Sequence, residues 1–220
     1  MPQKVLDYHD VLLYDSDLGL LEDEEWLNDQ VISFYFEYLS REKSRSCGFT
    51  FVPGATTFLL INAGSEDAAA VVEALQLKEQ KVIFLAVNDN PDVSTACGGS
   101  HWSLLVLDLN SSEARHYDSA RGANAGVAAE LLQKLQAALR LDAGAKLVTA
   151  ASPQQQNGYD CGVYVLAMAD LICDARARGL DWAGVDAELQ RALPPGAASQ
   201  WRSAVLALAH ELAGKGKVRC

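Results

Sequence analysis

The sequence is short of basic residues and of long apolar runs, and each shortage argues against a class of function. Its 220 residues include 18 Lys or Arg against 29 Asp or Glu, a net charge of −11. Because nucleic acids are bound largely through Lys and Arg contacts to phosphate, this balance argues against a nucleic-acid-binding protein. No apolar run approaches the length of a membrane span, and Met1–Asp7 has no secretory signal pattern. We therefore expect no nucleic acid and no membrane among the partners.

The cysteines are also few and widely spaced, and no Cys-x-x-Cys pair occurs. The five are Cys47, Cys97, Cys161, Cys173 and Cys220. An odd number at such spacings argues against a disulfide framework or a structural zinc site. Reduced thiols favour the cytoplasm or the nucleus. Because the cysteine spacing argues against a zinc site, we expect no metal, and we also expect no cofactor.

The chain has the composition of one globular domain. Half of its residues are hydrophobic and 21% are charged, enough for a sizeable core. We assign residues 1–220 to a single domain, with a core over about 5–212 and a frayed tail over 214–220. Hydrophobic periodicity predicts helices over 26–39, 57–62, 66–77, 124–140, 161–176, 183–192 and 198–213, and strands over 18–21, 48–52, 81–87, 100–107, 113–119 and 146–150. This order predicts an α+β fold in which helices flank a central sheet.

One cysteine stands where a nucleophile could be activated. Cys161 follows the polar stretch Gln154–Asp160 and precedes the apolar run Val163–Ala169, so it falls at the expected start of a helix. The positive end of a helix dipole favours the thiolate, which is the nucleophilic form of a thiol. A lone cysteine is more often structural, as we assume for Cys173.

A thiol nucleophile needs a base, and the base needs a group that orients it. If 101–107 and 113–118 form a hairpin, His101 and Asp118 meet at one edge of the sheet. A carboxylate beside the imidazole would fix its tautomer and stabilise the imidazolium ion. Gln155, with its neighbours Gln156 and Asn157, offers amide donors for an oxyanion hole, together with the N–H of Cys161. The other three histidines are given no role.

The same segments resemble a known family. Gly99–Val106, His116–Ser119 and Gln155–Tyr164 closely resemble the Ulp/sentrin-specific protease family of cysteine proteases, and Trp26–Asp29 and Val82–Asn90 resemble its deneddylase branch. The resemblance implies the papain-like α+β fold of the adenovirus-protease clan. It also implies cleavage after the C-terminal Gly-Gly of a ubiquitin-like modifier, here the Rub/Nedd-type modifier of cullins, by a monomer.

The resemblance assigns roles by position. It implies that Cys161 is the nucleophile, His101 the base, Asp118 the orienting carboxylate and Gln155 the oxyanion donor. Trp26 and Trp102 would wall a narrow tunnel for Gly-Gly, because glycine alone lacks a Cβ. Asp29 and the loop 88–99, including Asn90, would contact the modifier, and the acidic segment 15–25 would dock its basic face.

Three other functions fit part of this pattern. A SUMO-specific protease would use the same triad. A clan-related acetyltransferase would also use His, an acid and Cys, but the two tryptophans argue against it. A non-catalytic modifier-binding module would have no need for an imidazole beside a thiol.

Overall fold

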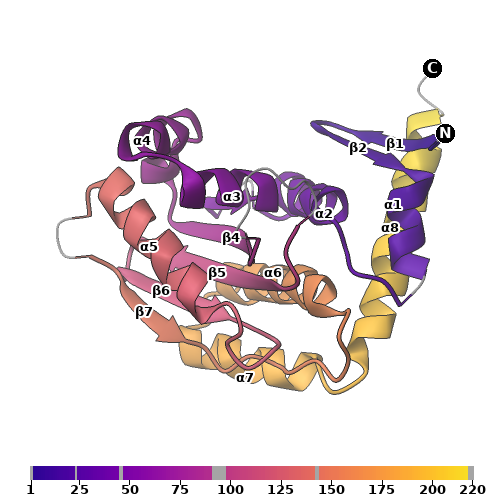
Figure 1. Ribbon diagram of the computed structural model, residues 1–220. Coiled ribbons are helices and arrows are strands. Elements are labelled where there is room, and N and C mark those ends of the chain that lie inside the picture. The colour runs from indigo at the N-terminus through magenta and orange to yellow at the C-terminus, as the bar shows by residue number, and fades with distance from the viewer. Residues whose placement is uncertain (1, 23, 45–46, 91–97, 142–143, 218–220) are drawn as a thin grey trace.

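The computed structural model describes residues 2–22, 24–44, 47–90, 98–141 and 144–217. Two strands and a helix come first, and the main sheet follows (Figure 1). In chain order the elements are β1 (Lys4–Tyr8), β2 (Val11–Tyr14), α1 (Asp15–Glu22), α2 (Asp29–Glu42), β3 (Phe49–Val52), α3 (Gly54–Asn62), α4 (Ser65–Ala74), the 3-10 helix η1 (Leu77–Glu79), β4 (Val82–Asn88), β5 (Trp102–Asp108), β6 (Glu113–Tyr117), α5 (Ala125–Leu139), β7 (Lys146–Thr149), α6 (Cys161–Ala177), α7 (Trp182–Ala192) and α8 (Ala197–Lys217).

A five-stranded mixed sheet in the order β3-β4-β5-β6-β7 forms the centre. The inner pairs β4–β5 and β5–β6 are antiparallel, and the outer pairs β3–β4 and β6–β7 are parallel. Strands β4 and β5 are buried almost throughout, as their continuous apolar runs predict. The predicted α+β class is confirmed.

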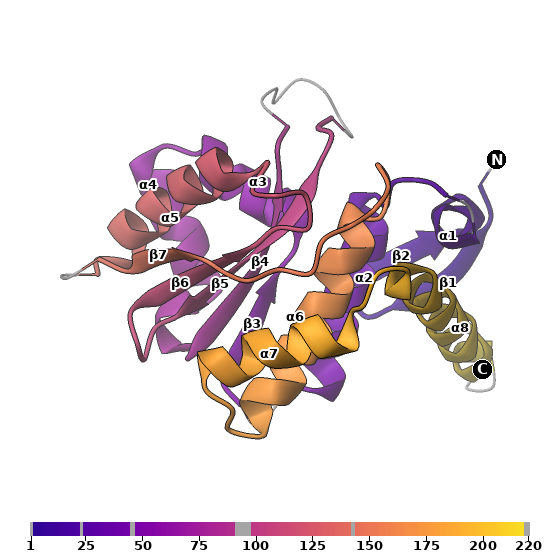
Figure 2. The same ribbon diagram turned by 90° about the horizontal axis from the view of Figure 1, so that it is seen from below.

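The two faces of the sheet are covered by different helices. Phe84, Ala86 and Leu104 point into a core with α2, α6, α7 and α8. Ile83 and Leu85, one residue along, point into a second core with α3, α4 and α5. This alternation is the two-residue period of a strand covered on both faces. Figure 2 shows α6 and α7 on one side of the sheet and α4 and α5 on the other.

The prediction of a strand over 18–21 was wrong. Leu18 and Leu21 lie on the buried face of helix α1, three residues apart. The carboxylate of Asp17 accepts a hydrogen bond from the Tyr14 backbone N–H at 2.8 Å, near the start of this helix. The strands of this region lie earlier, in the β1–β2 hairpin, which the sequence did not reveal.

The helix predicted from Trp26 begins three residues later. Asn28 is its N-cap, and the Asn28 side chain accepts a hydrogen bond from the Val31 backbone N–H at 3.1 Å. Trp26 and Leu27 therefore belong to the segment before the helix rather than to its first turn. The remaining predicted helices and strands are present, with ends that differ by a few residues.

Among the described residues, no helix is both long and apolar enough to cross a membrane. No cluster of three or more His, Cys, Asp or Glu side chains there could hold a metal ion.

Candidate active site

His101 and Asp118 meet at one edge of the central sheet. His101 immediately precedes β5, Asp118 immediately follows β6, and the antiparallel register pairs Leu104 with Tyr117. His101 Nε2 lies 2.7 Å from Asp118 Oδ1, and both side chains are buried. The predicted hairpin and the predicted pairing of the two residues are confirmed.

The carboxylate of Asp118 is held by several donors. Its Oδ1 accepts a hydrogen bond from the Ala120 N–H at 2.8 Å, and its Oδ2 accepts one from the Asn124 N–H at 2.9 Å. Burial alone would raise the pKa of Asp118, but the hydrogen bonds from His101, Asn124 and Ala120 together hold it below its usual value. The ionised form is therefore the stable one beside His101.

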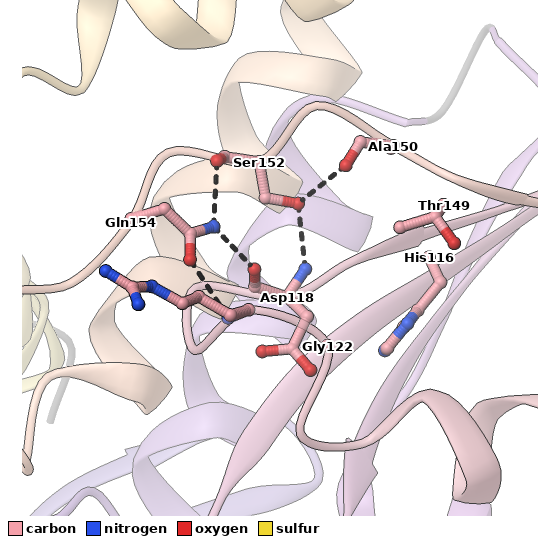
Figure 3. Close-up of a pocket in the computed structure, with 8 residues that line it drawn as sticks. His116, Asp118, Gly122, Thr149, Ala150, Ser152 and Gln154 are labelled. Carbon is pink, nitrogen blue, oxygen red and sulfur yellow. Dashed lines mark hydrogen bonds between the residues drawn. The ribbon is translucent and has the colours of Figure 1, made fainter.

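The segment between β7 and α6, which leads to Cys161, fixes the backbone of Asp118. Figure 3 shows Ser152 and Gln154 around this residue, at a cavity of about 300 Å³. The Asp118 N–H donates to Ser152 Oγ at 2.8 Å, and Gln154 Nε2 donates to the Asp118 carbonyl at 3.0 Å. His116 also lines this cavity, and burial lowers its pKa, so its imidazole is neutral near pH 7.

Cys161 is the first residue of α6 and is 1% exposed. Its side chain interacts with the imidazole of His101. Burial would lower the pKa of His101, but the interactions with Asp118 and Cys161 outweigh burial and raise that pKa to about 9. The imidazole thus interacts with both the thiol and the carboxylate.

The loop before Cys161 is ordered by its own amide side chains. Gln155 Oε1 accepts a hydrogen bond from Ser119 Oγ at 2.7 Å, and Gln155 Nε2 donates to the Asn157 carbonyl at 2.7 Å. Asn157 Oδ1 in turn accepts from the Asp160 N–H at 3.0 Å. These contacts orient the amide of Gln155, with its oxygen toward Ser119 and its nitrogen toward the end of the loop.

A groove of about 610 Å³ opens beside the thiol. It is lined by residues predicted to be catalytic or to bind substrate, namely His101, Cys161, Trp26, Trp102, Asp29 and Asn90. Trp26 is 49% exposed, and its Nε1 donates to the Gly158 carbonyl at 2.7 Å. Trp102 is buried, and its Nε1 donates to the Leu27 carbonyl at 2.9 Å. Both indoles are therefore fixed at the groove. Residues 91–97 of the expected contact loop lie outside the described residues.

One glycine sets the position of the Trp102 ring. A Cβ on Gly54, at the start of α3, would lie 2.6 Å from two ring carbons of Trp102 and 2.8 Å from Asp29 Oδ1. Only a residue without a side chain fits there. The sequence places Gly54 after Pro53, which indicates a turn and gives no sign of this contact.

Two polar residues that sequence reasoning missed also support His101. Asp89 Oδ1 accepts a hydrogen bond from the His101 N–H at 2.9 Å. Burial would raise the pKa of Asp89, but hydrogen bonds from Ser100 and His101 lower it. Asn124 Nδ2 donates to the His101 carbonyl at 3.2 Å. Asp89 follows a strand and Asn124 precedes a helix, so both look like ordinary turn residues in the sequence.

This arrangement agrees with comparisons against known proteins. The family model described as "Ulp1 protease family, C-terminal catalytic domain" matches residues 25–179. Sentrin-specific protease 8 of Homo sapiens is 39% identical over 178 residues, which cover 79% of this chain and 82% of that protein. NEDD8-specific protease 1 of Arabidopsis thaliana is 37% identical over 172 residues, which cover 78% of this chain and 76% of that protein.

The fold is shared with solved proteases. The Ulp1 protease domain solved in complex with Smt3, the yeast ortholog of SUMO, superposes with a TM-score of 0.71 at 21% identity, covering 97% of this chain and 89% of that one. The de-sumoylating protease superposes with a TM-score of 0.67 at 16% identity, covering 97% and 92%. With the family match and the identities above, the chain belongs to the Ulp1 protease family of cysteine proteases.

Proposed function

We propose that this protease cleaves the peptide or isopeptide bond after the C-terminal Gly-Gly of a NEDD8-type (Rub-type) modifier. The observation that carries the proposal is the hydrogen bond between His101 and Asp118, with Cys161 interacting with His101 in a groove that two fixed tryptophans also line. It supports the triad that the sequence predicted, with Cys161 as nucleophile, His101 as base and Asp118 as orienting carboxylate.

In this mechanism His101 takes the proton of the Cys161 thiol, and Sγ attacks the carbonyl carbon of the terminal glycine. The C–N bond then breaks, and protonated His101 gives its proton to the departing amine, leaving the modifier as a thioester on Cys161. His101 takes a proton from a water molecule as the water oxygen attacks the thioester carbonyl. The C–S bond then breaks, Cys161 leaves as a thiolate beside protonated His101, and the modifier is released with a free carboxylate. Asp118 stays ionised throughout and stabilises the imidazolium, which its lowered pKa supports.

The negative charge on the substrate oxygen needs donors. We assign Gln155 Nε2 and the backbone N–H of Cys161 to this task. An amide nitrogen carries two N–H groups, and the Asn157 carbonyl takes one of them. A flipped amide would set the Gln155 oxygen against the Asn157 carbonyl, two acceptors with no hydrogen between them, so this contact fixes the orientation of the amide. Donors that are oriented in advance stabilise developing charge without the cost of reorganising during the reaction.

The shape of the groove supports a glycine pair as the segment that enters it. Trp26 and Trp102 border the groove that Cys161 also lines, and the indole N–H of each is tied to a backbone carbonyl. Gly54 packs directly against Trp102, so that wall has no room to withdraw. A narrow channel between rigid rings rejects residues that carry a Cβ.

The choice of modifier rests on the relatives and on charge. Two relatives above 35% identity are named as proteases of NEDD8 or as sentrin-specific protease 8. We assign Asp29, Asn90 and the acidic segment 15–25 to contacts with the modifier, whose basic face would complement them. We further propose cullin conjugates as substrates, a monomeric enzyme and a place in the cytoplasm or nucleus.

Cleavage assays with several modifiers test the proposal. Wild type and Cys161→Ala would be incubated with NEDD8 precursor, a neddylated cullin, and the SUMO and ubiquitin counterparts. We expect wild type alone to cleave the two NEDD8 substrates. Cleavage by Cys161→Ala would overturn the assigned nucleophile, and preferential cleavage of SUMO substrates would overturn the assigned modifier in favour of a SUMO protease.

A further inference from the structure

A buried arginine of helix α8 contacts the loop that leads into Cys161. Arg202 on α8 is 7% exposed, and its Nε donates to Asp160 Oδ1 at 2.7 Å. Asp160 immediately precedes the nucleophile Cys161 and is itself buried. The guanidinium carbon also lies 5.6 Å from the centre of the Tyr159 ring. Arg202 therefore contacts Tyr159 and Asp160, the two residues that precede Cys161.

The same guanidinium also contacts the segment that carries Trp26. One terminal nitrogen donates to the Leu20 carbonyl at 2.6 Å, and the other donates to the Glu25 carbonyl at 2.7 Å. Leu20 lines the groove, and Glu25 is the neighbour of Trp26. One side chain thus contacts both the nucleophile loop and the segment that carries Trp26.

Two further contacts join these segments directly. Trp26 Nε1 donates to the Gly158 carbonyl at 2.7 Å, and the side chain of Tyr159 interacts with Glu24. Neither contact, however, carries a buried charge. The ion pair of Arg202 with Asp160 does, and a buried ion pair is costly to break because it leaves the other charge without a partner.

We infer that Arg202 is a positioning residue that sets both the placement of Cys161 and the distance between Cys161 and Trp26. This inference rests on the proposed function, since it concerns the groove that would admit the modifier. Arg202 lies beyond residues 25–179, the part of the chain that the family model matches. It touches no substrate and acts through the Asp160 loop and the segment 20–25.

The geometry gives arginine two separable tasks. The planar fork places three nitrogens in different directions, toward Asp160, Leu20 and Glu25. A lysine offers a compact charge on a flexible stem and cannot reproduce this fork. Arg202→Lys keeps a charge for Asp160 and loses the fixed contacts to the segment 20–25, whereas Arg202→Gln loses both.

The test compares Arg202→Gln and Arg202→Lys with a matched control. Arg115→Gln also removes a buried arginine from an ion pair with an aspartate, Asp186, but at the interface of β6 with α7. Each folded variant is assayed below its melting temperature in two ways. Iodoacetamide alkylation of Cys161, followed by mass spectrometry, reports the thiol alone. Hydrolysis of a fluorogenic NEDD8 C-terminal conjugate gives kcat and KM.

We expect Arg202→Gln to lower both the alkylation rate and kcat, the latter by roughly 10- to 100-fold, the size expected when reacting groups shift by about 1 Å. Arg202→Lys should restore the alkylation rate while KM stays several-fold above wild type. Arg115→Gln should lose stability and keep both kinetic readouts within about twofold.

Two results would overturn the inference. One is wild-type kinetics in folded Arg202→Gln, and the other is an equal kinetic loss in Arg115→Gln, which would mean a general effect of destabilisation. If Arg202→Gln does not fold, an Arg202→Lys enzyme with wild-type KM would overturn it as well. If wild type cleaves no modifier substrate, that result overturns the proposed function. The alkylation assay involves no modifier, so it still tests the role of Arg202 in that case.

Discussion

The contact between Gly54 and Trp102 predicts that one added methyl group impairs this protease. In Gly54→Ala the new Cβ would stand 2.6 Å from the Trp102 ring carbons Cη2 and Cζ3. Carbon atoms in contact prefer separations of about 3.5–4.0 Å, so the ring or the start of α3 must move by about 1 Å. The ring has little freedom, because it is buried and its Nε1 donates to the Leu27 carbonyl at 2.9 Å.

The size of the effect follows from that displacement. Overpacking a filled site costs roughly 1–3 kcal/mol of unfolding free energy. Trp102 is the residue after His101, so a shift of its backbone or ring also disturbs the base. A misplacement of about 1 Å in an active site lowers the rate roughly 100-fold. We therefore expect a protein that folds, with kcat/KM reduced about that much.

Urea unfolding and hydrolysis of a fluorogenic modifier conjugate measure both effects. Gly126→Ala is the matched control, because a Cβ there meets nothing within 4 Å and the residue lies in helix α5. Alanine in place of a helical glycine stabilises by about 1 kcal/mol at most. If Gly54→Ala matched the control in both stability and rate, the proposed rigid wall at Trp102 would be refuted.

Three further predictions concern the catalytic groups. Asp118→Asn should lower kcat by about 10³-fold or more, because the imidazolium loses its counter-charge and the imidazole tautomer is no longer fixed. Steady-state kinetics would show a smaller loss if Asp118 only stabilised the fold. Gln155→Ala should lower kcat roughly 10²-fold with little change in KM. Gln156→Ala, at the exposed neighbouring residue, should leave both constants unchanged. Equal effects of the two substitutions would contradict the oxyanion role of Gln155. The pKa of His101 is raised to about 9 from 6.5, so protonated His101 stabilises the fold fully below pH 6.5 and this stabilisation is lost as the pH rises through about 9. This rise in pKa corresponds to roughly 3 kcal/mol of unfolding free energy. Between pH 6 and 9.5 we therefore expect urea unfolding to show wild type losing about that much stability relative to His101→Gln. Parallel curves of stability against pH for the two proteins would count against the interaction of His101 with Asp118 and Cys161.

The sheet and the placement of His101, Asp118 and Cys161 could be predicted from the sequence because both depend on local patterns. The continuous apolar run of β4 indicates a strand buried on both faces, and the turn between β5 and β6 fixes which residues share an edge. His101 and Asp118 flank that hairpin, so their pairing follows from strand register alone. Cys161 stands between a polar loop and an apolar helix, which locates it at a helix start.

The features that were missed depend on contacts between distant parts of the chain. Leu18 and Leu20 fit a two-residue alternation, but Leu18 and Leu21 share a helix face, and only packing on α8 and β2 decides between strand and helix. Gly54 looks like a turn residue until the Trp102 ring is placed against it. Arg202 reads as one charge in an amphipathic helix, and its partners Leu20, Glu25 and Asp160 lie far away in sequence.

Covalent trapping would show whether a NEDD8-type modifier enters this groove and meets Cys161. Wild type and Cys161→Ala would be treated with vinyl-sulfone derivatives of NEDD8, SUMO and ubiquitin, and the labelled residue mapped by mass spectrometry. We expect the NEDD8 derivative to label wild type on Cys161 and to leave Cys161→Ala unlabelled. Labelling at another residue, or preferential labelling by SUMO or ubiquitin, would contradict this expectation.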